Sequence, residues 1–395
     1  MRTRSMHFDV LDSGPMVTTL GRDHLWSEGS GAAPPLKSPR DVRMANSGAW
    51  MSGDVEADAI PTSVRPLGIR DIPRLRMLDT LHAVNQPDAL VLAHHPLHSA
   101  VRSAIPGQRG KRPAFIAESG ERIIGFVGFR AELPDGRWAL QTLGASVGVY
   151  PAAPVWERIL EYAVQQAGLR GVRSLHARIP WGVGASDSLV QAGWSIYASE
   201  TIFQTPDTRP PGRPLIRPRL QEPADTWAIH QLYCAITPRS VQQAEAFTSR
   251  RWELPAGRPR RAPLVRGWVF EADSTVFGYV RALSGRRSSA IEVLIHPDRR
   301  DLAGPIIDGT LFALGDHGGR RSYCTIRGYQ SELARPLQEK GFAASFEQEL
   351  LVRYTTATVR RAVVESVPFS LDVRERVPQR APTFLQDAQE GGNLG

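Results

Sequence analysis

Two stretches of the chain, residues 61–205 and 215–362, show the same succession of hydrophobic and polar patterns. Each begins with an extended segment that leads into a helical periodicity, SVRPLGIRDIPRLRMLDTL in the first and LIRPRLQEPADTWAIHQLYCAI in the second. In the first stretch Asp71 precedes Pro73, and this arrangement is typical of a helix N-cap. We therefore expect a short strand and then a helix at the start of each stretch.

A β-hairpin pattern follows in both stretches. The run AFIAESGERIIGFVGFRAE turns at Ser119-Gly120, and the run GWVFEADSTVFGYVRALSG turns near Asp273-Ser274. A further strand, a helix and another strand follow each hairpin. The two stretches thus predict the same central elements.

The stretches also match at their glycines and at their ends. Gly125 and Gly278 occupy the same place in the second strand of each hairpin. Each stretch closes with a short helix, a glycine–aromatic pair and a final strand, in Leu189–Thr205 and in Leu337–Tyr354. Matched points lie roughly 150 residues apart throughout, and such self-similarity indicates an internal duplication.

The segments outside the two stretches have a different character. Residues 1–60 are rich in Gly, Ser, Pro and Asp without periodicity, which favours a disordered arm. Residues 206–214 are expected to form a linker, because their prolines fix φ and remove backbone donors. Residues 363–395 are expected to form a tail. The chain is thus predicted to consist of an arm, two folded halves joined by a linker, and a tail.

The composition of the 395-residue chain is ordinary for a globular protein, with 42% hydrophobic and 22% charged residues. The net charge of +8 comes mostly from arginine, which suits phosphate and carboxylate partners. Two interpretations are open: a phosphorylated or nucleic-acid ligand, or scattered arginines on a solvated surface. We favour the second, because few aromatic residues lie among the arginines. The arginine-rich run Arg258–Arg266 could contact a phosphate or an acidic substrate, but its prolines favour a mobile loop before the hairpin.

Neither a membrane segment, a secretory signal nor a metal site is expected. No run reaches the ~20 apolar residues of a membrane helix, and no apolar stretch follows the basic N-terminus. Cys234 and Cys324 form no CxxC pair, which indicates a reducing, cytoplasmic environment. His94 and His98 have helical spacing, but Pro96 interrupts it and no acidic ligand is near.

The order β-α-β-β-β-α-β-α-β, with its closing helix, glycine–aromatic pair and strand, resembles the GNAT acyltransferase superfamily. The run IEVLIHPDRRDLAGPIIDGTL at Ile291–Leu311 is similar to the family's central strand, phosphate loop and following helix. The resemblance implies an α/β (α+β) fold class with two tandem GNAT folds, each a mixed, mostly antiparallel sheet flanked by helices. In similar tandem proteins, the mycothiol synthase-like enzymes, the C-terminal copy usually acts.

The loop after the central strand decides whether a phosphate can bind. Successive N–H groups at a helix N-terminus favour an anion such as pyrophosphate. The family pattern Arg/Gln-x-x-Gly-x-Gly/Ala begins here at Arg300. Ala303 replaces its first glycine, Pro305 at its last position has no N–H, and Asp301 adds a negative charge. The resemblance implies acetyl-CoA as cosubstrate, held by seven residues: Leu294, Ile295, Arg299, Arg300, Leu302, Ala303 and Gly304.

The equivalent segment of the first half, VGVYPAAPVWERILEYAVQQAGL, has neither an arginine nor a glycine in its turn. Pro151 and Pro154 bracket two residues there, so we expect no phosphate cradle. We expect instead a helix from Val155 to Ala167 that ends at Gly168. The first half is then structural, or it supplies one wall of a substrate cleft.

Acyl transfer from a thioester to an amine needs a base, a polarised carbonyl and protonation of the leaving thiolate. Many GNAT enzymes place a glutamate on the central strand as a base acting through water, and the resemblance assigns this role to Glu292. The alternative is an outward-facing strand carboxylate. Backbone N–H groups at Leu294 and Ile295 would polarise the thioester.

The family commonly places its acid, a tyrosine, where this chain has Leu337, which cannot donate a proton. Tyr329, in the loop before the last helix, is the candidate acid, whereas Tyr323 is expected to pack in the core. Cys324 is expected to be a buried thiol rather than a nucleophile, because no base is identifiable beside it.

These patterns lead to two hypotheses. The first is an acetyl-CoA-dependent N-acetyltransferase that acts through its C-terminal half on an amine of a small molecule or peptide. The second is a tandem GNAT pseudoenzyme that binds or scaffolds other molecules. In either case we expect a monomer or a homodimer, without a membrane and without nucleic acid as partner.

Overall fold

The computed structural model describes residues 63–76, 78, 80–84, 88–92, 96–105, 107–108, 110–132, 136–146, 153–205, 212–255, 264–314 and 321–355. The described residues all belong to one compact unit. The predicted arm, the predicted tail and most of the proline-rich linker lie outside the described residues.

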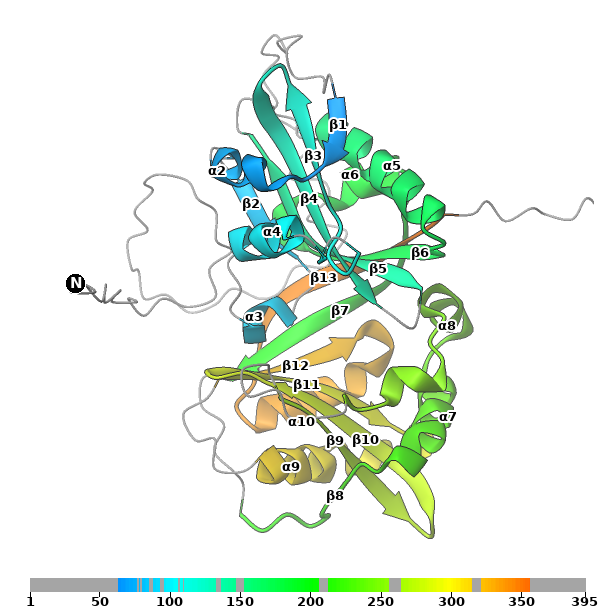
Figure 1. The fold of residues 1–395 in the computed structure, drawn as a ribbon. Helices are drawn as coiled ribbons and strands as arrows, with labels where there is room; N and C mark the ends of the chain where they lie inside the picture. Colours follow the sequence, from blue (N-terminus) through cyan, green and yellow to red (C-terminus); the bar gives the residue numbers. More distant parts are fainter. Residues whose placement is uncertain are drawn as a thin grey trace, which may run out of the picture. The chain divides into compact units, whose positions relative to one another are not determined.

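The first half has the predicted order of elements, with β2, α3 and α4 added before the hairpin (Figure 1). Its helix α5 is longer at both ends than the predicted one. The elements are β1 (Ser63–Pro66), η2 (Ile69–Asp71), α2 (Ile72–Leu75), β2 (Thr80–Ala83), α3 (Asp88–Leu92), α4 (Pro96–Ala104), β3 (Ala114–Ser119), β4 (Arg122–Glu132), β5 (Arg137–Ala145), α5 (Ala153–Leu169), β6 (Ser174–Pro180), η3 (Trp181–Val183), α6 (Ser186–Gln191) and β7 (Ser195–Thr205).

The second half repeats the predicted order of elements. Its elements are β8 (Arg219–Leu220), η4 (Pro223–Asp225), α7 (Thr226–Ile236), α8 (Arg239–Glu245), η5 (Ser249–Trp252), β9 (Leu264–Ala272), β10 (Thr275–Ser284), β11 (Ser288–Ile295), η6 (Pro297–Leu302), α9 (Ala303–Leu314), β12 (Arg321–Arg327), η7 (Gly328–Leu333), α10 (Ala334–Glu339) and β13 (Ala343–Tyr354). The predicted duplication therefore extends through matched strands, helices and turns.

The turns show why the local sequence specifies these elements. Gly120 has a φ of 57°, which an L residue rarely adopts, and it joins β3 to β4 at the predicted place. Asp273 and Ser274 have φ values of 48° and 60°, and two successive positive values are characteristic of a tight hairpin turn. Both predicted hairpins are confirmed.

The matched glycines have a packing role. A Cβ on Gly125 would lie 2.4 Å from Cγ1 of Val155 at the start of α5, and a Cβ on Gly278 would lie 3.0 Å from Cδ1 of Ile306 in α9. Helices α5 and α9 therefore pack directly on the backbone of the hairpin in their own half. Only glycine leaves room for this approach without displacing a neighbour.

The two halves also share an ion-pair arrangement that the sequence patterns did not predict. In each half an arginine of the first strand pairs with a carboxylate six residues later and with a carboxylate of the hairpin: Arg65 with Asp71 and Glu118, and Arg219 with Asp225 and Glu271. Asp71 also accepts from the backbone N–H of Gly68 at 2.8 Å, whereas no side-chain cap hydrogen bond reaches α2. Asp71 is the N-cap residue of α2, as predicted, but its carboxylate is held by Arg65 and Gly68 instead of capping the helix.

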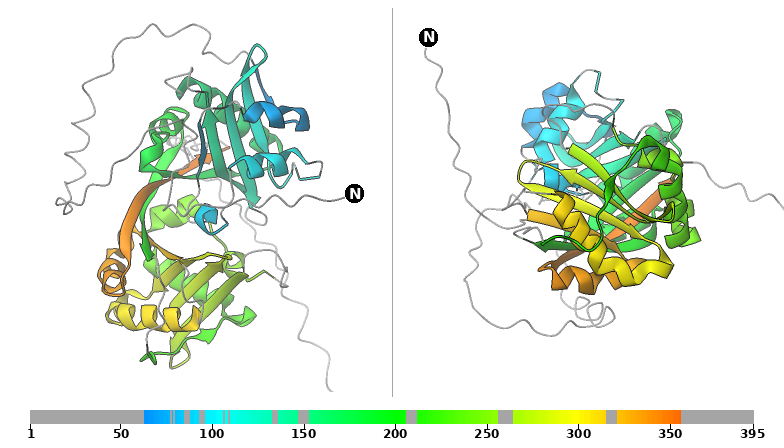
Figure 2. Two further views of the ribbon diagram at one scale, coloured as in Figure 1. Left: turned by 90° about the vertical axis from the view of Figure 1, so that its left-hand side faces the viewer. Right: turned by 90° about the horizontal axis from the view of Figure 1, so that it is seen from below.

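The strands of both halves form one continuous sheet, in the order β1-β3-β4-β5-β6-β13-β7-β12-β11-β10-β9-β8, with β2 beside β5. Most neighbours are antiparallel, and the pairs β5–β6 and β11–β12 are parallel. The closing strands are exchanged: β13 of the second half pairs with β6 of the first, and β7 of the first pairs with β12 of the second. These two strands also pair with each other, so each completes the sheet of the other half (Figure 2).

Helices cover both faces of each half. In the first, α5 and α6 pack on one face and α2 and α4 on the other. In the second, α9 and α10 pack on one face, and α7 and η5 on the other. Successive strand residues therefore alternate between two buried environments. Alternate residues of β11 face opposite sides of the sheet, so the two groups of candidate site residues described below lie on opposite faces.

Candidate functional site

In the first half, β5 has a neighbour on both edges. On one edge β4 pairs along its whole length, and on the other β6 pairs only with residues 137–139 before it diverges. The position beyond that divergence is taken by β2, which pairs with residues 142–145 of β5. The half therefore closes its own central edge with a segment of its own chain.

In the second half, the corresponding edge of β11 is open. Its parallel pairing with β12 ends at Glu292, although β11 continues to Ile295. Among the described residues no strand takes the place that β2 occupies in the first half. A side chain reaches this edge instead, since Nε2 of the buried Gln330 donates to the carbonyl of Val293 at 3.0 Å.

The register shows which backbone groups face the open edge. The N–H of His296 donates to the carbonyl of Phe277 in front of β10, and pairing alternates along an antiparallel ladder. The N–H of Leu294 therefore points to β10, and the N–H of Ile295 points to the open edge. Of the two predicted thioester donors, only Ile295 has a backbone N–H directed to this edge.

The segment predicted as a phosphate loop consists of two short helical pieces, η6 and the start of α9. Nδ1 of His296 accepts from the N–H of Asp298 at 3.3 Å and so begins η6. The guanidinium of Arg300 pairs with Glu332 at 3.1 Å, and that of Arg299 lies 4.7 Å from the ring centroid of Phe277. Both predicted phosphate-binding arginines thus have partners within the protein.

The N-terminus of α9 keeps part of the predicted cradle. The N–H of Ala303 is used by the carbonyl of Arg300. Gly304 faces open space, since a Cβ on it would meet nothing within 4 Å. Leu302 is half-buried in front of the helix. A phosphate at the start of α9 would therefore contact Gly304 and be favoured by the helix dipole. It would find fewer free backbone N–H donors than the sequence pattern predicted.

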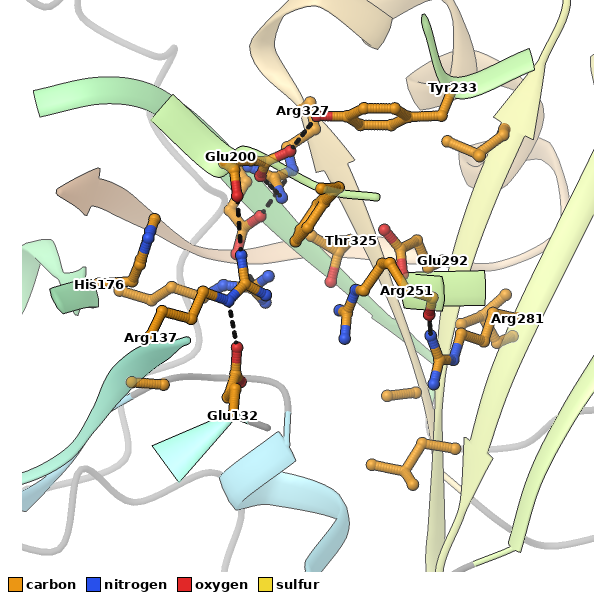
Figure 3. A pocket seen from close by; sticks show the side chains of 18 of the residues that line it. Glu132, Arg137, His176, Glu200, Tyr233, Arg251, Arg281, Glu292, Thr325 and Arg327 are labelled. Carbon is orange, nitrogen blue, oxygen red and sulfur yellow. Dashed lines mark hydrogen bonds and ion pairs between the residues drawn. The ribbon is translucent and has the colours of Figure 1, made fainter. Parts of the chain in front are cut away.

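A cavity of about 320 Å³ lies on the other face of the sheet, where residues of both halves meet (Figure 3). The first half contributes residues of β4 to β7, and the second contributes residues of α7, α8, η5 and β9 to β12 and the segments between them. Its charged lining consists of Arg130, Glu132, Arg137, Arg178, Glu200, Glu245, Arg251, Arg281, Glu292 and Arg327.

Glu292 stands in this cavity and is half-buried. It lies between Arg281 of β10 and Thr325 of β12, its cross-strand partners, and all three side chains line the cavity. The carboxylate therefore sits where the pairing of β11 and β12 ends. The equivalent residue of the first half is Thr142, which lies three positions before Ala145 as Glu292 lies three before Ile295.

Tyr329 lines the same cavity from η7. Its hydroxyl lies 3.4 Å from Oγ1 of Thr237. Burial raises the pKa of Tyr329 above its ordinary value, and the charge of Arg327 opposes part of this rise. The phenol therefore keeps its proton near neutral pH, as a proton donor must.

Arg327 is one of the buried charges of the cavity. Its Nε lies 3.1 Å from Glu200 and its Nη2 lies 2.9 Å from Glu245. Glu245 also accepts a hydrogen bond of 2.7 Å from the hydroxyl of Tyr233, whose pKa is raised by burial. Arg327 belongs to β12, Glu200 to β7 and Glu245 to α8, so the cluster forms only when the strands are exchanged.

No family model and no curated protein matches this sequence. Among solved structures, a GCN5-related N-acetyltransferase from Sphaerobacter thermophilus is 12% identical, with 75% of this chain and 98% of that chain covered and a TM-score of 0.45. A tandem GNAT protein from the clavulanic acid biosynthesis pathway is 12% identical, with 75% and 99% covered and a TM-score of 0.44. Because these sequence identities and TM-scores are low, the assignment of the fold rests on the chain's own strand order and repeated elements.

The chain has a tandem GNAT fold. Both halves contain the hairpin, the parallel strand pair with its crossover helix, and the closing helix and strand that the family order requires. Within this tandem GNAT fold, Glu292, Leu294 and Tyr329 of the predicted site line the cavity. Ile295, Arg299, Arg300, Leu302, Ala303 and Gly304 lie beyond it, at the end of β11 and around the start of α9.

The remaining predictions on single residues divide into those that the structure describes and those that it does not. Tyr323 and Cys324 are buried, as predicted, and burial raises the pKa of the Cys324 thiol to about 12. Leu337 packs in the core with α9. The side chains of His94 and His98, and most of Arg258–Arg266, lie outside the described residues.

In the described part of the chain, no group of three or more His, Cys, Asp or Glu residues is arranged to hold a metal ion. No helix there is both long enough and apolar enough to cross a membrane.

Sequence patterns missed the arginines of the cavity and its glutamates other than Glu292. Arg137, His176 and Arg327 lie on ordinary strands, and a strand pattern does not tell which edge a strand will join. The one available signal was that strands with mostly buried neighbours carried charged residues, and buried charge is rare without a partner or a function.

Proposed function

We propose that the second half transfers an acetyl group from acetyl-CoA to an amine of a small molecule or peptide. The observation that carries this proposal is the open edge of β11 beside Glu292, at the mouth of a cavity that reaches both halves. An unpaired strand edge offers backbone groups to the acyl donor, and the neighbouring carboxylate can take a proton from the acceptor. The first half lacks both features, because β2 covers its edge and Thr142 stands in place of the glutamate.

We assign a role in the reaction to each residue from its position in the site. Glu292 would accept the proton of the acceptor amine, directly or through a water molecule. The N–H of Ile295 would donate to the thioester oxygen as negative charge develops there. Tyr329, which keeps its proton because burial raises its pKa, would protonate the leaving thiolate.

The phosphates of acetyl-CoA would lie at the start of α9. Gly304 leaves space there, the helix dipole favours an anion, and Arg299 and Arg300 are the nearest predicted cations. Arg300 would have to exchange Glu332 for a phosphate. Exposed ion pairs of this kind contribute about 1 kcal/mol or less, so the exchange is feasible.

A second function, binding without catalysis, is favoured by one specific observation. Gln330 donates to the carbonyl of Val293 at the place where an acyl donor would have to pair. The used N–H of Ala303 and the proline at position 305 weaken the phosphate site in the same direction. Under this alternative the second half would be a scaffold whose open edge is plugged by its own side chain.

Transfer from acetyl-CoA, measured as released CoA thiol with a panel of amines, separates the two functions. Glu292→Gln should lower kcat by about 100-fold to 10,000-fold, the usual contribution of a positioned acid or base, without changing the melting temperature by more than a few degrees. Glu347→Gln is a matched control, because Glu347 is an exposed strand glutamate far from this role. In the active protein, excess acetyl-CoA should raise the melting temperature, because it binds only the folded state. Absence of both transfer and a thermal shift would exclude the enzyme and leave the scaffold.

A further inference from the structure

The cavity between the halves carries more positive than negative charge. Its lining includes six arginines and four glutamates, whereas His176 is neutral because burial and the nearby Arg137 lower its pKa to about 3. Buried charges are costly unless they are paired, so an excess of arginine in an enclosed site indicates a missing anion.

Arg327 shows where that anion would bind. Its side chain is 9% exposed, and Glu200 and Glu245 engage Nε and Nη2. In the part of the chain that the structure describes, no group accepts a hydrogen bond from its third nitrogen, Nη1. A buried donor without an acceptor destabilises the folded protein, so a bound acceptor would recover that energy.

Two further polar atoms of residues that line the cavity have no hydrogen-bond partner among the described residues. They are Oγ1 of Thr325 and Nε of Arg251. Thr325 precedes Arg327 by two positions on β12, so both side chains stand on the same face about 7 Å apart along the strand. Figure 3 shows Thr325 between the Arg327–Glu200 pair and Glu292, and Arg251 beside Glu292.

These donors lie on the opposite face of β11 from the predicted phosphate site. Glu292 and Leu294 point into the cavity, whereas Val293 and Ile295 pack with α9. A CoA phosphate at the start of α9 would therefore not satisfy Arg327 or Thr325. The unpartnered donors require a second anionic group, and within this cavity it would belong to the acceptor.

We propose that the acceptor is a small amine that carries a carboxylate, in the manner of an amino acid. Its carboxylate would bind to Nη1 of Arg327, Oγ1 of Thr325 and Nε of Arg251, and its amine would lie at Glu292. This inference rests on the proposed function, since it identifies the acceptor of the same site.

A carboxylate suits this site better than a phosphate. Glu200, Glu245 and Glu292 already lie in the cavity, and their negative charge would repel a dianion more strongly than a monoanion. The planar guanidinium also matches the planar carboxylate. The volume of about 320 Å³ is at the lower end of small-molecule sites, which favours a single small acid over a peptide.

The test uses the full-length chain with acetyl-CoA and three sets of probes: the twenty common L-amino acids, their primary amides, and O-phosphoethanolamine. The amides keep the α-amine and the shape but remove the negative charge. We expect at least one amino acid to be acetylated with a kcat/KM at least tenfold above that of its amide and above that of O-phosphoethanolamine. Amides acetylated as well as their acids would overturn the inference, and preference for O-phosphoethanolamine would overturn the assignment to a carboxylate.

Variants connect this preference to the cavity. Arg251→Gln and Thr325→Val should each raise KM for the acid about tenfold and leave the amide unchanged, whereas loss of a merely structural residue would affect both probes alike. Arg286→Gln is the control, because Arg286 is exposed on the turn between β10 and β11. An acid KM that stays at the wild-type value in both variants, or acid and amide KM values that rise by the same factor, would count against the site.

Calorimetric binding of the preferred acid without acetyl-CoA keeps the two proposals apart. If the acid binds, and binds more weakly to Arg251→Gln, while no transfer occurs, the anion site stands and the proposed activity fails. If transfer occurs to neutral amines without preference for acids, the activity stands and the anion site fails.

Discussion

His176 provides a test of how the stability of the folded protein depends on pH. It lies on β6, its Nε2 is 3.0 Å from Oγ of Ser174, and its ring is 6.3 Å from that of Tyr197. Burial lowers its pKa to about 3, and the positive charge of Arg137 acts in the same direction. The imidazole is therefore neutral in the folded protein throughout the range in which an unfolded histidine becomes charged.

The sign and size of the effect follow from this pKa. A histidine with a folded pKa below its unfolded value of 6.5 gives full stability above that value, and the stability is lost as the pH falls toward about 3. Between pH 7.5 and pH 5, proton binding to the unfolded chain should lower the free energy of unfolding by about 2 kcal/mol through this residue. His176→Gln cannot titrate, so it should lose about 2 kcal/mol less than the wild type over the same interval.

The assay is urea unfolding followed by tryptophan fluorescence at pH 7.5, 6 and 5. Ser174→Ala is the control, because it removes the hydrogen-bond partner of His176 and leaves the histidine able to titrate. It should retain the pH dependence of the wild type even if its stability is lower at every pH. If wild type and His176→Gln lose the same free energy between pH 7.5 and 5, within the roughly 10–15% error of extrapolation, the argument from burial is refuted.

Two further predictions concern the second half. Gln330→Ala should bind acetyl-CoA about five- to tenfold more tightly than the wild type in calorimetry, because it frees the carbonyl of Val293 and one hydrogen bond is worth about 1 kcal/mol; unchanged or weaker binding would show that Gln330 does not compete at this edge. Iodoacetamide at pH 8 should modify one thiol per folded chain and two after unfolding, because Cys234 is exposed, whereas Cys324 is buried with its pKa raised to about 12. Mass spectrometry that finds Cys324 alkylated in the folded protein would contradict its burial.

The local features of this fold could be predicted because local chemistry determines them. The hairpins at Gly120 and at Asp273-Ser274 depend on residues that accept positive φ. The glycine-aromatic closings depend on Gly193 and Gly341, whose φ values are 79° and 80°. The hydrophobic periods then place the helices, and roughly constant separations between matched points indicate the duplication.

The candidate site was predictable only in part. Glu292 and Tyr329 were found from the family resemblance, and both line the cavity. The segment after β11 was predicted as a phosphate-binding loop, whereas it forms η6 and its Arg300 pairs with Glu332. Sequence alone did not show this, because an ion pair between two loops depends on how the loops are placed.

The amino-acid sequence by itself thus determined the two copies and the order of their elements. The tertiary structure decided which strands meet. A strand presents the same pattern of N–H and C=O groups to any neighbour, so nothing in the sequence of β7 or β13 specifies the half that it completes. That exchange places Glu200 beside Arg327, and the pairing of β2 with β5 closes one central edge while the other stays open. The asymmetry on which the proposed activity depends therefore arises from long-range strand pairing rather than from any motif.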